Sequence, residues 1–254
     1  MPKMDRFPEE FDDLLNARGR RLLRDVPRLE ALMAKRQTPI VVLDDVMDDG
    51  VARDCIRLLD EAMYPYLRRM HVPIPRTALT DMEENYAERL PKTVRVKTVT
   101  FNSPKSNALE AARQCGLAGL LWSKSFHRLA QRATTPPLRS DYWARQVICY
   151  EHGDYSGPHN DHHPQRAEAR NGFIDLHIMF SNDGVASQSL VYEDKRYLSS
   201  IRDVSSRAAI AVYRLPFWHY TTPLVARRGR ESTARRWLLL GSFDYDPPLP
   251  KLEY

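Results

Sequence analysis

The sequence predicts an α+β protein in which N-terminal helices support a double-sheet jelly roll. In the first half of the chain, apolar residues recur every three or four positions among charged ones, which is the period of amphipathic helices. After residue 137 the chain changes to short runs rich in Val, Ile, Tyr, Phe and Trp, separated by turn residues. Eight short strands at such spacing are typical of a jelly roll. They are expected at 143–150, 157–161, 172–180, 188–193, 196–201, 207–214, 217–222 and 234–244.

Helices and two further strands are predicted before the jelly roll. The helices are expected at 8–35, 51–69 and 109–133, where apolar positions follow the helical period. The aspartates just before residue 51 favour a helix start there, because carboxylates are stabilised at the positive end of a helix. The strands are expected at 40–43 and 93–101, which are rich in β-branched or other apolar residues.

The chain is expected to form one structural unit made of two segments. Residues 1–136 would supply helical support with a few strands, packed on a jelly-roll core of residues 137–254. The stretch 72–91 is polar and interrupted by prolines, so it is predicted to be a loop. A loop of this kind beside the functional site could serve as a lid, and the sequence does not decide whether it does.

Composition and charge narrow the function classes. A hydrophobic content of 43% is enough for a sizeable core. Lysine and arginine exceed aspartate and glutamate by 38 − 33 = 5, a small and scattered surplus that does not indicate a nucleic-acid partner. The three cysteines show no disulfide or zinc spacing, which indicates a reducing compartment. The sequence shows no signal peptide and no apolar run of membrane-spanning length, so a cytoplasmic protein without a membrane partner is expected.

The chemistry of the sequence centres on His159 and Asp161, which lie two residues apart. In an extended strand alternate side chains point to the same face, so the two can converge on one metal ion. A third ligand is expected from His219, in a second aromatic-rich strand. Two histidines and one carboxylate on one face of the metal are the ligand set of non-haem iron(II) oxygenases.

A wider set of motifs resembles the iron(II)/2-oxoglutarate-dependent dioxygenases, with the prolyl-4-hydroxylase-like branch as the nearest type. The motifs are Tyr150-x-x-Gly153, His159-x-Asp161, His219 before Pro223-Leu224-Val225, and a later arginine beside Trp237. The resemblance implies a double-stranded β-helix fold, the jelly roll of that family. It implies an enzyme that holds Fe(II) through His159, Asp161 and His219 and uses 2-oxoglutarate and O2. The reaction would be hydroxylation of a C–H bond in a small molecule or a peptide side chain, with release of succinate and CO2.

The family binds the far carboxylate of 2-oxoglutarate with a basic residue, and a guanidinium suits a carboxylate because it donates two parallel hydrogen bonds. Arg235 is the first candidate, because it shares a strand face with Trp237. Arg230 is the second, since the family places this residue about ten positions after the distal histidine, here His219. Arg236 is the third.

Three further side chains are assigned to the site. Tyr150 matches a family tyrosine that hydrogen-bonds the cosubstrate, although an aromatic core residue would fit as well. His177 lies in an otherwise apolar strand, where a buried imidazole needs a partner. It either lines the substrate pocket or is a core histidine with a partner of its own. Trp237 is assigned to the substrate pocket with it.

Two other functions remain open. Oxidative demethylation of alkylated nucleic acid uses the same iron chemistry, and Arg230 and Arg236 resemble the arginine pair of those enzymes, but the asparagine expected between them is absent. A jelly-roll binding protein with structural histidines is the non-enzymatic alternative. Because Asp161 is present, hydroxylation is favoured over halogenation, in which relatives replace this carboxylate by a small residue. The primary substrate and the oligomeric state do not follow from the sequence.

Overall fold

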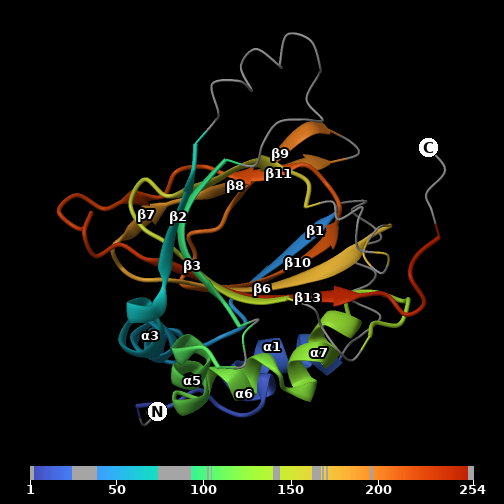
Figure 1. Cartoon of the computed structure of the whole chain (residues 1–254), viewed down its shortest axis with the longest axis horizontal. Coiled ribbons are helices and arrows are strands. Elements are labelled where there is room, and N and C mark those ends of the chain that lie inside the picture. The colour runs from blue at the N-terminus through green and yellow to red at the C-terminus, as the bar shows by residue number, and fades with distance from the viewer. Residues whose placement is uncertain are drawn as a thin grey trace.

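The computed structural model shows a strongly curled β-sheet with helices packed on one side (Figure 1). Eleven strands form this sheet, in the order β1-β10-β6-β13-β4-β3-β5-β11-β8-β9, with β2 pairing with β3 outside this path. A separate pair is formed by β7 and β12. The structure describes residues 3–24, 39–73, 93–101, 103, 105–139, 144–161, 167, 169, 171–194 and 197–250.

All the strand pairs are antiparallel. The strands are β1 (Ile40–Asp44), β2 (Arg68–Val72), β3 (Val94–Thr100), β4 (Ala144–Tyr150), β5 (Tyr155–His159), β6 (Phe173–Ser181), β7 (Val185–Ser187), β8 (Ser189–Asp194), β9 (Tyr197–Asp203), β10 (Ala208–Leu215), β11 (His219–Thr221), β12 (Val225–Ala226) and β13 (Arg236–Asp244). Figure 1 shows two facing layers, with β1, β10, β6 and β13 below and β8, β9 and β11 above. This is a jelly roll, as the sequence predicts.

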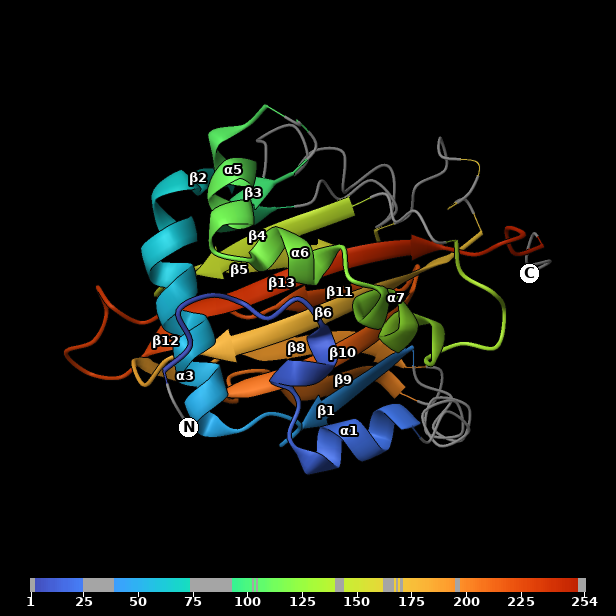
Figure 2. The ribbon, with the colours of Figure 1, turned by 90° about the horizontal axis from the view of Figure 1, so that it is seen from below.

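The helices cover the outer face of the lower layer (Figure 2). They are α1 (Ala17–Arg24), α3 (Asp49–Leu58), α5 (Asn107–Gln114), α6 (Leu117–Leu121) and α7 (Lys124–Gln131), with short 3-10 turns at Phe11–Leu14 and Tyr64–Tyr66 and a π-helical turn at Leu59–Met63. Within the described ranges, none of these helices has the length and apolar character needed to cross a membrane.

The largest hydrophobic core lies between these helices and the lower layer. Strand alternation divides β6 between two environments. Its side chains from Ile174 to Phe180 at even positions join the helix-side core, whereas Phe173, Asp175 and His177 line a cavity between the layers. In β13, Trp237 likewise joins the helix-side core. Both central strands are therefore buried on both faces.

The strand predictions are confirmed with small changes at the ends. Each of the eight expected ranges after residue 137 contains one strand of the main sheet, and the strands expected near 40–43 and 93–101 are β1 and β3. The sheet also joins the two predicted segments, because β1 pairs with β10 and β3 pairs with β4. Residues 1–136 thus contribute strands to the main sheet as well as the helices that support it.

The helix predictions were too long. The expected helix 109–133 is three helices. The backbone turns at Gly116, whose φ is +83°, and Ser123 caps the start of α7, because its side chain accepts a hydrogen bond from the Phe126 amide. The expected helix 51–69 ends as an α-helix at Leu58, continues as the π-helical turn Leu59–Met63 and then as a 3-10 turn that contains Pro65. Residues 68–69 already belong to β2.

Two other predictions fall partly outside the described residues. The predicted helix 8–35 contains a 3-10 turn and α1, and positions 25–38 are not described. The hypothesis of a lid at 72–91 concerns a stretch that, beyond Pro73, lies outside the described residues.

Close contact between α7 and β13 gives a test of this packing. A Cβ added at Gly241 would lie 2.6 Å from a Phe126 ring carbon, so Gly241→Ala would overpack the helix-side core. We expect the free energy of unfolding to fall by roughly 1–3 kcal/mol, measured by denaturant titration. The matched control is Gly119→Ala on α6, where an added Cβ meets nothing within 4 Å. That variant should be neutral or more stable by up to about 1 kcal/mol, and equal losses in both variants would contradict the packing argument.

Candidate metal centre and its cavity

The two predicted histidine ligands are held side by side by strand pairing. His159 ends β5 and His219 begins β11, and the two residues are direct partners in the antiparallel register. In each ring Nδ1 lies close to a backbone carbonyl oxygen two residues earlier, Gly157 at 2.7 Å and Phe217 at 2.9 Å. With a proton on Nδ1 donated to that oxygen, Nε2 of each ring keeps its lone pair for a metal ion.

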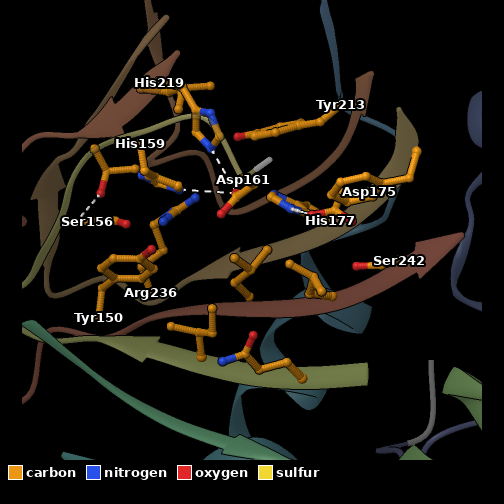
Figure 3. Close-up of a pocket in the computed structure, with 17 residues that line it drawn as sticks. Tyr150, Ser156, His159, Asp161, Asp175, His177, Tyr213, His219, Arg236 and Ser242 are labelled. Atoms are coloured by element: carbon orange, nitrogen blue, oxygen red, sulfur yellow. Dashed lines mark hydrogen bonds and ion pairs between the residues drawn. The ribbon is translucent and has the colours of Figure 1, made fainter. Parts of the chain in front are cut away.

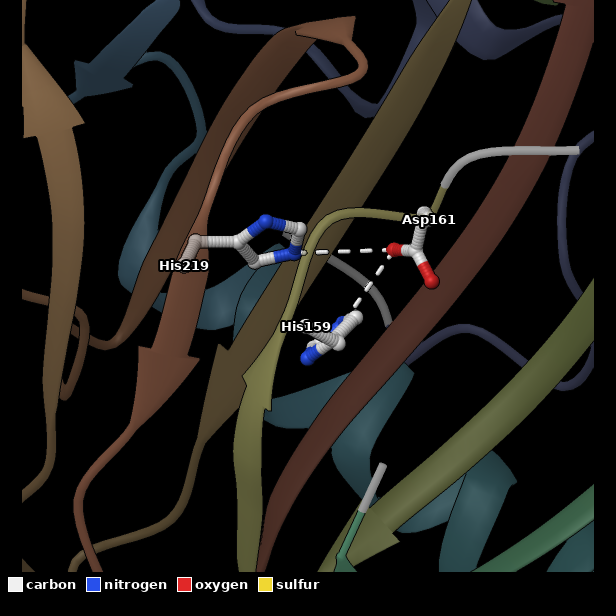
Figure 4. Close-up of side chains that lie close together, drawn as sticks. All are labelled: His159, Asp161 and His219. Atoms are coloured by element: carbon white, nitrogen blue, oxygen red, sulfur yellow. Dashed lines mark ion pairs between the residues drawn. The ribbon is translucent and has the colours of Figure 1, made fainter. Parts of the chain in front are cut away.

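Asp161 completes the triad (Figure 4). Its Oδ2 lies 3.2 Å from Nε2 of His159 and 3.6 Å from Nε2 of His219. The three candidate ligand atoms all lie within 4.8 Å of one another. This arrangement fits a divalent transition metal that takes two imidazole nitrogens and one carboxylate oxygen, such as Fe(II).

The convergence of His159 and Asp161 has a different origin from the one expected. Strand β5 ends at His159, so Asp161 does not continue it as an alternating strand residue. Instead the backbone of Asp161 has φ of +51°, in the left-handed region that Asp tolerates better than most residues. The turn, rather than strand alternation, brings the carboxylate back to the histidines.

Gly157 anchors the strand that carries His159. Its amide donates a 2.7 Å hydrogen bond to the carbonyl oxygen of Thr93, just before β3. A Cβ at this position would lie 1.9 Å from Thr93 Oγ1 and 2.9 Å from the Thr93 carbonyl oxygen. Only glycine allows this close approach, and the sequence analysis did not identify it.

The triad borders a cavity of about 270 Å³ between the two layers (Figure 3). At one end of the view lie Tyr150 and Arg236, and at the other lie Asp175 and His177, with the triad between the two ends. Side chains from β4, β5, β6, β10, β11 and β13 all contribute to the lining. The cavity therefore brings Tyr150 and His177 together with the predicted metal ligands.

Arg236 brings a buried positive charge to this cavity. Only 2% of its surface is exposed, and its guanidinium donates to the Val204 carbonyl oxygen at 2.9 Å and to Gln188 Oε1 at 3.1 Å. Its Cζ lies 5.1 Å from the centre of the Tyr150 ring. Burial lowers the pKa of Arg236, while Tyr150, Tyr213 and the carboxylate of Asp203 act in the opposite direction. Among the described residues, none of the ion pairs joins a carboxylate to Arg236.

The structure places Arg235 and Trp237 on the opposite side of the sheet. Arg235 Nη1 lies 3.3 Å from Asp60 Oδ1, and its guanidinium stacks 4.0 Å from the centre of the Tyr64 ring. Trp237 is fully buried in the helix-side core, and its Nε1 donates to the same Asp60 oxygen at 3.1 Å. The two do share a face, as expected, but it is the face that packs on the helices. Neither residue lines the cavity.

Arg230 also lies away from the triad. It belongs to an exposed turn before β13, where its carbonyl oxygen accepts hydrogen bonds from the Thr233 and Ala234 amides. Its side chain is exposed and does not line the cavity. The structure thus separates Arg230 from Arg236, the two arginines that suggested a demethylase.

The sequence did not predict a place in the cavity for the polar residues Asp175 and Tyr213. Asp175 is two residues before His177 on β6, so strand alternation puts both on the same face. That spacing was a usable signal for Asp175. Tyr213 has no such signal, because it comes from β10 and reaches the cavity only through the pairing of β10 with β6.

The triad predicts how metal affinity responds to the loss of one histidine. His219→Ala removes one of three ligands, so we expect iron(II) affinity to fall by more than roughly 100-fold, since losses of supporting groups alone cost 10–100-fold. Anaerobic equilibrium dialysis with metal analysis measures the change. The control is His71→Ala, an exposed histidine on β2 that should leave affinity unchanged. If the His219→Ala protein bound iron(II) as tightly as the wild-type protein does, the proposed metal site would be refuted.

Comparison with known proteins supports the fold assignment. No model of a known protein family and no curated protein matches the sequence. Among solved structures, an oxidoreductase of the 2OG-Fe(II) oxygenase family from Burkholderia pseudomallei is 13% identical, with 86% of this chain and 90% of that chain covered and a TM-score of 0.53. The non-haem α-ketoglutarate-dependent carbocyclase SnoK from nogalamycin biosynthesis is 13% identical, with 87% of each chain covered and a TM-score of 0.52.

A third similar structure is a prolyl hydroxylase from Trichoplax adhaerens in complex with a peptide fragment of the hypoxia inducible factor oxygen degradation domain. It is 10% identical, with 92% of this chain and 96% of that chain covered and a TM-score of 0.50. Similarity at these identities establishes a shared fold. The chain has the double-stranded β-helix fold of the 2-oxoglutarate- and iron(II)-dependent oxygenases, which the motifs predicted.

Proposed function

We propose that this protein is an iron(II)- and 2-oxoglutarate-dependent oxygenase that hydroxylates a C–H bond of a small molecule or a peptide side chain. The observation that carries the proposal is the pairing, in one buried cavity, of the His159–Asp161–His219 triad with the buried guanidinium of Arg236. A metal site alone fits many functions. A metal site beside a buried cation that forms no ion pair with the described carboxylates fits a cosubstrate that is both a chelator and an anion.

Arg236 is the residue that we assign to the far carboxylate of 2-oxoglutarate, in place of Arg235 and Arg230. A buried charge without an ionic partner is costly, and a bound carboxylate would compensate it. Hydrogen bonds to Val204 and Gln188 hold the guanidinium in position before the cosubstrate arrives. Arg235 already has Asp60 as its partner.

Tyr150 is the second residue that we assign to the cosubstrate. It is 4% exposed, lines the same cavity and pairs with Arg236 across β4 and β13. Burial raises the pKa of its hydroxyl, so the group stays protonated and can donate a hydrogen bond to a carboxylate.

The remaining parts of the mechanism follow from the positions of the side chains. His159, Asp161 and His219 would hold the metal, and carbonyl and strand contacts keep the two imidazole donors oriented. When bound, iron(II) supplies the oxidising chemistry, in which 2-oxoglutarate and O2 are converted to succinate and CO2 as the substrate C–H bond is hydroxylated. Side chains from both sheet layers line the cavity in which this reaction would take place.

The substrate assignment covers two classes, because similar folds are associated with both. SnoK is a carbocyclase of a biosynthetic route, and the Trichoplax prolyl hydroxylase was solved with a peptide. We also infer a cytoplasmic location. Its support is the state of Cys55, Cys115 and Cys149, which are all free thiols in buried positions.

Turnover of the cosubstrate tests the proposed reaction. Anaerobically iron-loaded protein is exposed to O2 with 2-oxoglutarate, and succinate is quantified. We expect slow, iron-dependent succinate formation that is lost in His219→Ala, because the triad is then incomplete. If neither iron nor 2-oxoglutarate binds the wild-type protein, the oxygenase assignment fails and a non-enzymatic binding protein becomes the better assignment.

Adjacent arginines test the cosubstrate site. Arg236→Gln removes the buried charge and should weaken 2-oxoglutarate binding by roughly 30-fold or more, the effect of losing one partner of a buried charged pair. Arg235→Gln is the matched control, since it makes the same change one residue away on the helix side and should leave cosubstrate affinity unchanged. Calorimetry on anaerobic, metal-loaded protein measures both. A loss confined to Arg235→Gln would return the assignment to that residue.

If Arg236→Gln does not fold, Tyr150→Phe examines the same end of the cavity. It removes only a hydroxyl group from the lining and should weaken 2-oxoglutarate binding to a smaller extent.

A further inference from the structure

A second buried polar cluster lies at the end of the cavity opposite to Arg236 (Figure 3). Asp175 and His177 from β6 and Tyr213 from β10 form it. Asp175 is 5% exposed and His177 is 7% exposed, so both are more than nine-tenths buried. The His177 ring stacks on Tyr213, with 4.1 Å between ring centres. The proposed roles of the metal and the cosubstrate make no use of this cluster.

Two polar atoms of this cluster have no hydrogen-bond partner among the described residues. They are Asp175 Oδ1 and His177 Nε2. The nearest approach between the two side chains, from Asp175 Oδ2 to His177 Nε2, is 3.7 Å, which is too long for a hydrogen bond. In the described part of the chain, no lysine or arginine forms an ion pair with Asp175. A buried carboxylate in this state is costly unless a cation or a hydrogen-bond donor enters the cavity.

Arg236 does not supply that cation. Asp175 pairs with Ser242 across β6 and β13, whereas Arg236 pairs with Ser181. The backbone positions of the two residues are thus six residues apart along the paired strands, which corresponds to roughly 20 Å of strand length. The negative charge of Asp175 and the positive charge of Arg236 are therefore separate features of one cavity.

We propose that Asp175 and His177 bind the protonated amine of the substrate, which would then be an aliphatic amine. This inference rests on the proposed oxygenase function and assigns the substrate class of the same site. An ammonium group carries three N–H donors, which can satisfy Asp175 Oδ1 and, when His177 is protonated at Nδ1, its Nε2 as well. Its charge compensates the carboxylate.

Tyr213 sets the direction of the bound molecule. Its ring contacts His177 on one side and lies edge-on to His219 on the other, with 5.5 Å between the ring centres of Tyr213 and His219. A carbon chain that starts at the amine would run along Tyr213 toward the metal ligands. The C–H bond that lies near the metal ligands would then be separated from the amine by the width of the Tyr213 ring.

Cavity size limits the rest of the substrate. The volume of about 270 Å³ is below the roughly 300–1,000 Å³ typical of sites for drug-sized ligands, and 2-oxoglutarate must share it. The part of the substrate that lies inside the cavity is therefore short, whether it is a small aliphatic amine or one extended side chain that carries the amine.

The test uses three probes of similar shape with the wild-type protein: n-butylamine, 1-butanol and butyrate. Binding is measured by calorimetry under anaerobic conditions, both with iron(II) and 2-oxoglutarate and with the protein alone. We expect n-butylamine to bind at least roughly tenfold more tightly than 1-butanol, and butyrate to bind more weakly than either. Equal affinity for the amine and the alcohol, or tighter binding of butyrate, would overturn the proposal.

Variants then connect the preference to one residue. Asp175→Asn keeps the shape but removes the charge, so the preference for the amine over the alcohol should disappear. Asp183→Asn is the control, because it neutralises an exposed aspartate outside the cavity, and the preference should persist. Preference retained in the Asp175→Asn protein would reject the assignment. If that variant does not fold, the probe series on the wild-type protein still decides the question.

The two proposals fail separately. Iron and 2-oxoglutarate binding without amine preference leaves the oxygenase assignment intact and removes the amine site. If the protein prefers the amine but binds neither iron nor 2-oxoglutarate, the amine site remains and the oxygenase assignment fails. Stimulation of succinate formation by free L-lysine, compared with a lysyl peptide blocked at both ends, distinguishes a small molecule from a side chain as the source of the amine.

Discussion

Burial of both faces of β6 and β13 is the constraint on which the rest of the structure depends. One face of each strand completes the hydrophobic core under the helices, and the other lines the cavity. The helices therefore support the site from behind, although none of their residues lines it. A side chain placed on one face of these strands packs in the hydrophobic core, whereas a side chain on the other face lines the cavity. This is why Arg235 and Arg236, adjacent in sequence, have unrelated partners.

Most of the architecture could be predicted from the sequence, because strands and turns depend on local residue patterns. The jelly roll followed from runs of β-branched and aromatic residues, and the three candidate metal ligands followed from residue type and spacing. Two features were not local. Which face of β13 meets the cavity depends on where the helices pack, and the return of Asp161 depends on a single left-handed residue. The prediction of one continuous helix over 109–133 was also wrong, since Gly116 and Ser123 interrupt a segment whose apolar residues otherwise follow the helical period.

Charge is distributed along the cavity in a definite order. A buried cation, Arg236, lies at one end, a buried anion, Asp175, lies at the other, and the candidate metal ligands lie between them. Such an order would orient two bound molecules in opposite senses, with the anionic cosubstrate toward Arg236 and a cationic substrate toward Asp175. The separation of the two charged side chains along the strands prevents them from neutralising each other directly. Both charged side chains can therefore bind ligands of opposite charge.

The backbone of Asp161 has a consequence for how the site can evolve. A φ of +51° is adopted more easily by glycine than by any residue with a side chain, and β-branched residues are strained there. Exchange of aspartate for glycine would thus relax the main chain while it removes the carboxylate. The turn would persist, and the two histidines would still be held by their strands. One substitution would therefore reduce the side chains available to a metal ion from three to two, at a position where the backbone conformation favours glycine.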